Sequence, residues 1–346
     1  MTRFFKVFLF CFLPVSLWAQ ADYTTVYGFL NLPSSAYAAS LGGSPIVSAD
    51  TNVNLFLVNP ALLKNGKAHQ VGLNFTNVSP GLNMGTVAWG YDSEKLGNVG
   101  LAIQYMNFGQ MDRYDEFGTS QGTFSGGDYA FVASWSQLLI EDLRLGVNAK
   151  LIHSKIDQYN ATAAAFDAGI TYHNEDLLLT ASVLAKNIGR QIDEYIDGEK
   201  EHLPRDYQLG IAKKLTHAPF RFSLVGHHLH DANLIIKNYN TVTPNNTDLE
   251  PDELETDYLN KNSEKLMRHL IFGVEFLPGK KFSARAGYNY YRRSTMKMIE
   301  KGGLVGFSLG ATILVKGLYI DYAYTASHLA GGINQISIRT NASRFF

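Results

Sequence analysis

The feature that most constrains this chain is a two-residue alternation, in segments of about ten residues, between apolar side chains and small or polar ones. In residues 71–76, for example, the apolar Val71, Leu73 and Phe75 alternate with a glycine, an asparagine and a threonine. Successive side chains of a β-strand point to opposite faces, so each such segment predicts a strand with one apolar face. The pattern recurs at 99–105, 166–172, 270–276, 305–313 and 318–324. No segment after the first twenty residues keeps an apolar period of 3.6, so we predict an all-β fold.

The alternating segments predict about fourteen strands in an antiparallel transmembrane β-barrel with an N-terminal hatch or plug segment. About 280 residues follow the expected plug, or roughly 20 per strand and connection, as tilted membrane strands require. A mean hydropathy of -0.08 excludes a bundle of transmembrane helices, each of which would need about 20 apolar residues. We expect strands at 68–78, 83–92, 98–108, 127–138, 143–155, 162–173, 177–187, 205–215, 219–230, 267–277, 281–292, 303–315, 317–326 and 333–346.

The connections between these segments separate a membrane barrel from a soluble sandwich. Those after the even-numbered strands are short, at 94–95, 141–142, 175–176, 216–217, 278–279 and 316–317. Three of the others are long, at 109–126, 188–204 and 231–266. Short turns at one end and long loops at the other are typical of barrels in the outer membrane of Gram-negative bacteria, where the long loops face outside. Greek-key crossings of a soluble sandwich would not sort loops in this way.

The first residues have the features of an export signal. Arg3 and Lys6 precede the apolar run 7–15, and Ala19-Gln20-Ala21 has the pattern of a cleavage site. We therefore expect a cleaved signal peptide at 1–21, with cleavage after Ala19 or Ala21 left open. The apolar run is too short for a membrane anchor. The single cysteine, Cys11, lies inside this run, so a disulfide framework in the mature chain is excluded.

Residues 22–66 do not alternate cleanly and are rich in small and turn-forming residues. We predict that they fold into the mouth of the barrel at 67–346 as a hatch, because Phe29, Leu30 and Phe56 favour burial. A disordered tail is the alternative. The hatch residues that stand out are Leu41, Gly42, Gly43, Asn59, Pro60 and Ala61.

Charged residues recur on the strand face opposite to the apolar one. A Lys or Arg at mid-membrane on the lipid face would cost about 2–4 kcal/mol, so these side chains are expected to point into the lumen. Their near balance of sign indicates a packed interior rather than an ion-selective ring. They are Lys150, Asp167, Lys186, Glu275, Arg285, Asp321 and Arg339.

One long connection is strongly acidic. It carries Asp248, Glu250, Asp252, Glu253, Glu255 and Asp257. Such a run indicates a solvated loop and a candidate partner-binding loop, and loose divalent-cation binding stays open, although the spacing is not that of a calcium loop.

The search for chemistry gives little. No G-x-S-x-G, H-E-x-x-H, S-x-x-K or phosphate-binding loop occurs, so we expect no enzymatic activity and no cofactor. His228 and His230 share one face of the strand expected at 219–230, but no third ligand is near them in sequence. We therefore expect a strand-end position rather than a metal site. The net charge of -1 argues against a nucleic-acid partner.

Several segments resemble known families. The triplet Asn59-Pro60-Ala61 resembles the hatch of FadL-like outer-membrane transporters. The mature chain is also similar to the PorQ-like and PorV-like barrels of the type IX secretion system of Bacteroidota. This second resemblance depends on residues 129–136, 146–150, 167–173 and 203–204, and above all on 213–223.

The resemblance implies a FadL-like fourteen-stranded barrel and a place in the attachment complex of that secretion system. Such a barrel holds the surface protein PorZ at the membrane, beside the sortase PorU and the barrel PorV. The complex processes secreted cargo and joins it to anionic lipopolysaccharide, and the PorQ-like barrel is not its transpeptidase. The alternative is passive transport of hydrophobic compounds, which would require an apolar path through the lumen.

Overall fold

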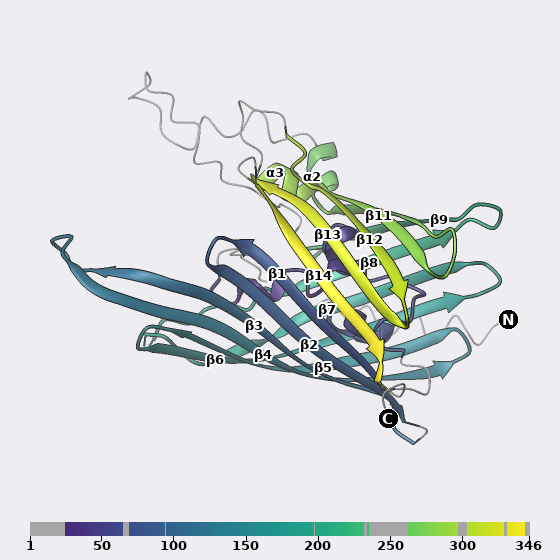
Figure 1. Cartoon of the computed structure of the whole chain (residues 1–346). Coiled ribbons are helices and arrows are strands. Elements are labelled where there is room, and N and C mark those ends of the chain that lie inside the picture. The colour runs from purple at the N-terminus through teal and green to yellow at the C-terminus, as the bar shows by residue number, and fades with distance from the viewer. Residues whose placement is uncertain are drawn as a thin grey trace.

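The computed structural model describes residues 25–64, 69–93, 95–196, 198–231, 234, 262–296, 303–328 and 331–342. Fourteen antiparallel strands form one closed barrel, in which consecutive strands pair and β1 pairs with β14 (Figure 1). The predicted fold class is therefore confirmed. The strands are β1 (Gln70–Ser79), β2 (Leu82–Ser93), β3 (Gly97–Tyr114), β4 (Ser120–Ile140), β5 (Leu143–Ile156), β6 (Tyr159–Asn174), β7 (Leu179–Asp193), β8 (Asp206–Lys214), β9 (Phe220–Gly226), β10 (Leu270–Phe276), β11 (Phe282–Asn289), β12 (Phe307–Val315), β13 (Leu318–His328) and β14 (Gly331–Asn341).

The alternation in the sequence decides which side of the barrel each side chain faces. On β1, Leu73 and Phe75 are 50% and 53% exposed on the outer surface, whereas Asn74 and Thr76 are buried inside. The outer face is therefore apolar and the inner face polar, as a barrel in lipid requires. None of the helices in the described part of the chain is long and apolar enough to span a membrane.

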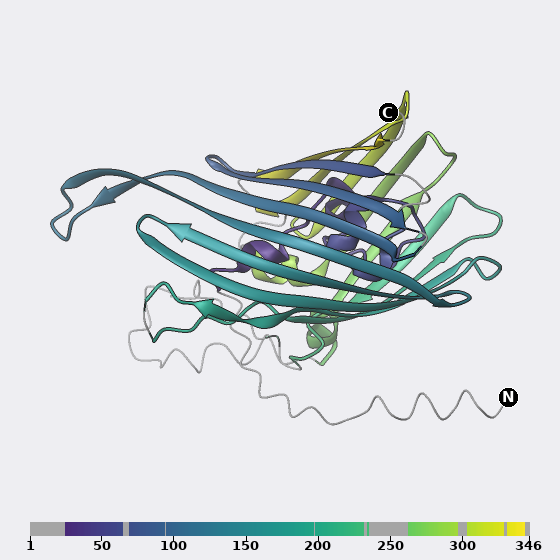
Figure 2. The same cartoon turned by 90° about the horizontal axis from the view of Figure 1, so that it is seen from below.

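The N-terminal segment is folded inside the barrel (Figure 2). It consists of four short helices, η3 (Gly28–Asn31), α1 (Ala36–Ser40), η4 (Val53–Leu57) and η5 (Pro60–Leu62). The side chains of Ser35, Asn52 and Asn59 each accept a hydrogen bond from the first turn of the helix that follows. Helices this short gain little from propensity, so packing against the inner wall must hold them. We call residues 25–64 the hatch.

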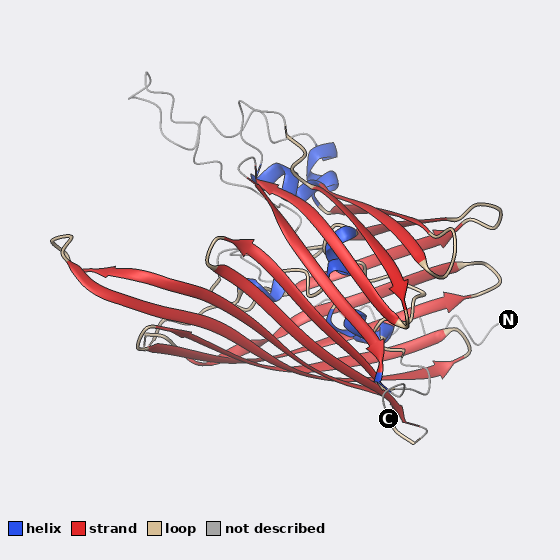
Figure 3. Ribbon diagram, viewed as in Figure 1, coloured by secondary structure: helices blue, strands red, loops and turns tan. Residues whose placement is uncertain are grey.

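The connections define two ends of the barrel. The connections at 94–96, 141–142, 175–178, 215–219, 277–281 and 316–317 lie at one end, which we call the turn end, and none exceeds five residues. The opposite end, here the loop end, carries the long connections at 194–205, 227–269 and 290–306, with α2 (Asn262–Arg268) and α3 (Tyr290–Met296), as well as two-residue connections such as 80–81 and 157–158 (Figure 3).

Several predicted bounds are wrong at the loop end. The expected loop 109–126 is mostly a hairpin, because β3 continues to Tyr114 and β4 begins at Ser120. Residues there are exposed on both faces, so no apolar alternation marks the strands. The strand expected at 219–230 ends at Gly226, and the one at 281–292 ends at Asn289 and continues as α3. The strand expected at 303–315 begins only at Phe307.

Some predictions concern residues outside those that the structure describes. They are the signal peptide at 1–21 and the acidic residues of the loop 231–266, namely Asp248, Glu250, Asp252, Glu253, Glu255 and Asp257.

Candidate functional site

The hatch packs against glycines on the inner face of the barrel. A Cβ atom on Gly146 of β5 would lie 2.2 Å from the carbonyl carbon of Pro60. A Cβ atom on Gly169 of β6 would lie 2.1 Å from Oδ1 of Asn59. The predicted Asn59-Pro60-Ala61 motif therefore touches the backbone of the wall, which only glycine permits.

Asn59 fixes this contact with hydrogen bonds in two directions. Its Oδ1 accepts from the backbone N–H of Ala61 at 3.0 Å. Its Nδ2 donates to the carbonyl of Ile46 at 3.0 Å and to Oγ1 of Thr171 on β6 at 3.2 Å. One side chain thus caps a hatch helix and joins it to the wall.

The Leu41-Gly42-Gly43 segment makes a second docking turn. Gly42 has a φ of +86°, which ends α1 in the left-handed conformation that favours glycine. The carbonyl of Gly42 accepts hydrogen bonds from Nδ2 of Asn289 at 3.1 Å and from Nη2 of Arg292 at 3.3 Å. The hatch is therefore also tied to the loop end of β11 and to α3.

A buried charge network joins the hatch to β9 and β10. Arg221 of β9 donates from Nε to Oε1 of Glu275 at 2.6 Å and from Nη2 to Oε2 at 2.8 Å. The same guanidinium donates to both carboxylate oxygens of the hatch residue Asp50, at 3.1 and 2.8 Å. The hydroxyl oxygen of Tyr37 lies 3.1 Å from Oδ2 of Asp50 and 3.1 Å from Oε2 of Glu275, so its single proton can be donated to either carboxylate. Bidentate arginine–carboxylate pairs of this kind are strong and directional.

The network continues around the wall through β11, β13 and β14. Nε of Arg285 lies 3.3 Å from Oε2 of Glu275, and its guanidinium stacks 4.2 Å from the ring centre of Tyr37. Asp321 lies 3.7 Å from Arg285 and 3.4 Å from Arg339. Three arginines therefore face three carboxylates, counting Asp50, so the network is neutral when all are ionised.

A second, smaller charge cluster lies on β5, β6 and β7. Nζ of Lys150 is 2.8 Å from Oδ2 of Asp167 and donates to Oδ1 of Asn187 at 2.7 Å. Nδ2 of Asn148 donates to the same Oδ2 of Asp167 at 2.9 Å, and the backbone N–H of Asn187 donates to Oδ1 at 2.8 Å. Lys186, on the next strand, is partly buried. Lys150 and Asp167 thus form a buried ion pair that is hydrogen-bonded on both sides.

The lumen charges named from the sequence belong to these two clusters, except Lys186, which has no ion pair among the described contacts; three partners were missed. Arg221 had a signal, because it stands between the outward-facing Phe220 and Phe222. Asp50 and Tyr37 had none, since the hatch has no periodicity from which an orientation can be read.

The hairpin of β3 and β4 projects past the other strands at the loop end (Figure 1). At its tip, Phe117 is 85% exposed and Tyr114 is 60% exposed. The carboxylate of Asp115 organises the turn by accepting the backbone N–H groups of Phe117 at 3.0 Å and Thr119 at 2.8 Å. The tip is therefore an ordered, aromatic surface.

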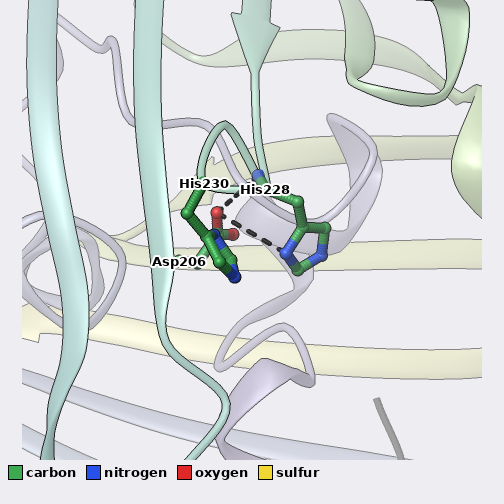
Figure 4. A group of neighbouring side chains, drawn as sticks. All are labelled: Asp206, His228 and His230. Carbon is green, nitrogen blue, oxygen red and sulfur yellow. Dashed lines mark hydrogen bonds and ion pairs between the residues drawn. The ribbon is translucent and has the colours of Figure 1, made fainter. Parts of the chain in front are cut away.

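A third group of residues lies at the loop end of β8 (Figure 4). Asp206, His228 and His230 place one ligand atom each within 4.8 Å of the others. The expected strand face of the two histidines is wrong, since His228 has a φ of 53° and the chain turns there. Burial lowers the pKa of both imidazoles below the usual histidine value, which favours their neutral form.

Comparison with known proteins gives structural matches only. No family model matches the sequence, and no curated protein matches it either. The toluene transporter TodX of Pseudomonas putida is similar in structure, with a TM-score of 0.51 and 10% identity over 89% of this chain and 96% of that chain. A FadL homologue of Pseudomonas aeruginosa has a TM-score of 0.50 and 10% identity over 89% of this chain and 98% of that chain. The monoaromatic hydrocarbon channel CymD has a TM-score of 0.51 and 9% identity over 89% of this chain and 96% of that chain.

These similarities establish the fold. The chain has a FadL-like, fourteen-stranded barrel of the kind found in outer membranes of Gram-negative bacteria. The solved structures that share it are channels and transporters. At about 10% identity the likeness carries no activity over to this chain.

Proposed function

We propose that this protein is a non-enzymatic outer-membrane barrel that anchors a surface partner. The PorQ-like features of the sequence favour a PorZ-like partner, within the attachment complex that also contains PorU and PorV. The observation that carries the proposal is the hatch, which is bonded into the lumen by Arg221 and seated on wall glycines.

A hatch held in this way favours an anchor over a pore. Undocking it would separate Arg221 from Asp50 and leave the wall network with three arginines facing two carboxylates, Glu275 and Asp321. The Asp50 side chain is 34% exposed, so this pair contributes about 1 kcal/mol or less. Undocking would also break the hydrogen bonds from Asn59 to Thr171 and from Asn289 to Gly42, each of which contributes about 0.5–1.5 kcal/mol. A protein that only holds a partner has no need to open, so such interactions impose no penalty on its function.

The docking surface in this proposal is the hairpin tip at the loop end. Phe117 and Tyr114 supply exposed aromatic area, which is the type of side chain that dominates binding energy at interfaces. Asp115 and Glu116 stand beside them and would steer a basic partner surface. The acidic run 248–257, which belongs to the connection between β9 and β10, is a second candidate element.

Transport of hydrophobic compounds is the second candidate function, because TodX and CymD have the same fold. It requires a route for an apolar solute. The charged inner face around Glu275 and Asp321 opposes such a route, since burying an apolar solute there would strand polar groups.

The experiment measures partner retention and solute uptake in the same cells. The strains carry wild type, a full deletion, a deletion of 244–260, and a hairpin variant in which an Asn-Gly turn replaces 112–123. This turn joins Met111 and Phe124, which already pair across the hairpin, so the barrel should remain intact. Phe117→Ser tests the tip alone, with Leu215→Ser at the turn end as the matched control, because Leu215 is 40% exposed.

The anchor proposal expects the full deletion and the hairpin variant to release the surface partner from washed cells, with Leu215→Ser like wild type. Uptake of toluene should be unchanged in every strain. If the full deletion retains its surface partners but stops uptake, the transporter function is correct and the anchor proposal is wrong.

A further inference from the structure

We propose that Asp206, His228 and His230 form a binding site for a divalent transition-metal ion, with Zn²⁺ as its best-fitting occupant. The three residues come from two segments, the first residue of β8 and the turn after β9 (Figure 4). The site is independent of whether the barrel anchors a partner or transports a solute.

The geometry is close to that of a metal site. Nδ1 of His228 lies 3.6 Å from Oδ1 of Asp206, and all three ligand atoms lie within 4.8 Å of one another. Bonds of about 2.0–2.1 Å to a tetrahedral ion would place the ligands roughly 3.4 Å apart. A small rotation of the imidazoles toward the carboxylate would therefore complete the site.

The burial of the group supports a ligand rather than a solvated surface cluster. Asp206 is 5% exposed, and the His228 side chain is 12% exposed. Nδ1 of His230 is buried and has no hydrogen-bond partner among the described residues. A buried ring nitrogen without a partner is costly, and a metal ion would satisfy it.

The carboxylate is held in place by groups that do not occupy all of its lone pairs. Oδ1 of Asp206 accepts the backbone N–H of His228 at 2.6 Å, and Oδ2 accepts Nε2 of Gln208 at 2.6 Å. Each oxygen keeps a free lone pair for a metal. Hydrogen bonds from surrounding residues orient metal ligands in this way in known sites.

The backbone of His228 gives a further indication. A φ of 53° is uncommon for a residue other than glycine, and it marks the turn at which the chain leaves β9. Here it turns the His228 N–H onto Asp206 and brings the imidazole to the same side.

The ligand types select the class of metal. Two imidazoles and one carboxylate suit Zn²⁺ and its first-row neighbours, whereas Ca²⁺ and Mg²⁺ prefer oxygen ligands alone. Three protein ligands leave a fourth position for water or for a ligand from another molecule. The charges that act against a cation are Lys186, which pairs across the ladder with Asp206, and Arg205. Their presence predicts moderate rather than extreme affinity.

The site has a structural consequence. It would join the loop end of β8 to the turn that follows β9, at the start of the long connection to β10. Lys186 and Asp206 are the last pair of the β7–β8 ladder, so a bound ion would strengthen the point at which strand pairing stops.

The test uses the full-length barrel, purified in detergent with an affinity tag that contains no histidine. The tag is then cleaved off, and the protein is dialysed against a chelator to remove bound metal. Calorimetric titration with Zn²⁺ measures stoichiometry and affinity, and Co²⁺ replaces Zn²⁺ for visible absorption spectra. The variants are His230→Ala and Asp206→Asn. His217→Ala is the control, since this exposed histidine lies at the turn end.

We expect one Zn²⁺ per wild-type chain, tetrahedral Co²⁺ absorption, and at least a 10-fold loss of affinity in either variant. The positioning residue Gln208 is tested by Gln208→Ala, for which a 10–100-fold loss is expected with the Co²⁺ spectrum retained. His217→Ala should bind like wild type. Failure of the wild type to bind Zn²⁺ would overturn the proposal, and so would unchanged binding in His230→Ala, which removes no hydrogen bond of the described structure.

Discussion

Replacing Arg221 by methionine tests whether the charge network holds the hatch and the barrel together. Methionine keeps much of the aliphatic stem but removes the guanidinium, which contacts both Glu275 of the wall and Asp50 of the hatch. We expect Arg221→Met to destabilise the folded barrel and to undock the hatch around Asp50.

The magnitude follows from the two carboxylates taken separately. Glu275 is 2% exposed, so losing its bidentate partner leaves a buried charge, at about 3–5 kcal/mol. Glu275 still has Arg285 at 3.3 Å, so we expect the loss of stability to lie at the lower end of this range. The Asp50 side chain is 34% exposed, and solvent screening limits that pair to about 1 kcal/mol or less. We therefore expect a total loss of roughly 3–4 kcal/mol.

The assay is urea unfolding in detergent, followed by the folded, fast-migrating band on unheated gels. The hatch is monitored separately by Ser48→Cys, because Ser48 is 1% exposed and the only natural cysteine is Cys11. Thiol labelling of this reporter should be slow in the parent and fast with Arg221→Met. Arg113→Met is the control, since the Arg113–Asp157 pair is exposed and should contribute less than about 1 kcal/mol.

A double-mutant cycle decides whether the loss comes from the stranded charge. Glu275→Gln removes that charge, so the double variant should be more stable than the sum of the single losses by about 1–3 kcal/mol. If the two changes are additive, or if Arg221→Met behaves like Arg113→Met, the network does not hold the fold and the reasoning is refuted.

Three further predictions follow from packing, lipid exposure and topology. Gly146→Ala should undock the hatch and cost about 1–3 kcal/mol by overpacking against Pro60, whereas Gly85→Ala, whose Cβ would come no nearer than 4.0 Å to the carbonyl oxygen of Asn74, should be neutral in the same urea assay. Leu101→Arg, on the outer face, should cost about 2–4 kcal/mol in lipid vesicles, as measured by the unfolding midpoint, and equal stability would contradict a lipid-facing position. With the loop end outside, Ser263→Cys should react with a membrane-impermeant thiol reagent on intact cells and Lys95→Cys should not; the reverse pattern would invert the topology.

The alternation was sufficient to predict the strands wherever one face meets lipid. Leu73 and Phe75 reveal β1 because lipid selects apolar side chains on every second residue. The signal disappears where the hairpin leaves the membrane, so the extension of β3 to Tyr114 was missed. It also misleads at His228, where a left-handed residue ends the ladder without any change in composition.

The candidate metal site depends on strand pairing, which brings together residues that are distant in the sequence. Asp206 lies far from His228 along the chain, and only the register of β8 and β9 brings them together. The short turn 215–219 sets this register, with Lys214 opposite Arg221 and Leu209 opposite Gly226. Continuing it places Asp206 opposite Leu229, between the two histidines. A register deduced from the turn could therefore have supplied the third ligand that the local sequence lacks.

The hatch inside the lumen also sets an energetic condition for any transported solute. A ligand shifts a conformational equilibrium only by the difference between its affinities for the two states. If undocking the hatch costs about 3 kcal/mol, a solute must bind the open barrel roughly 150-fold more tightly than the closed one to populate it equally. The inner face that the solute would contact carries Glu275, Arg285 and Asp321. These charged side chains would not bind an apolar solute more tightly in the open barrel than in the closed one. An anchored partner makes no such demand, because it binds outside the lumen and leaves the hatch where Arg221 holds it.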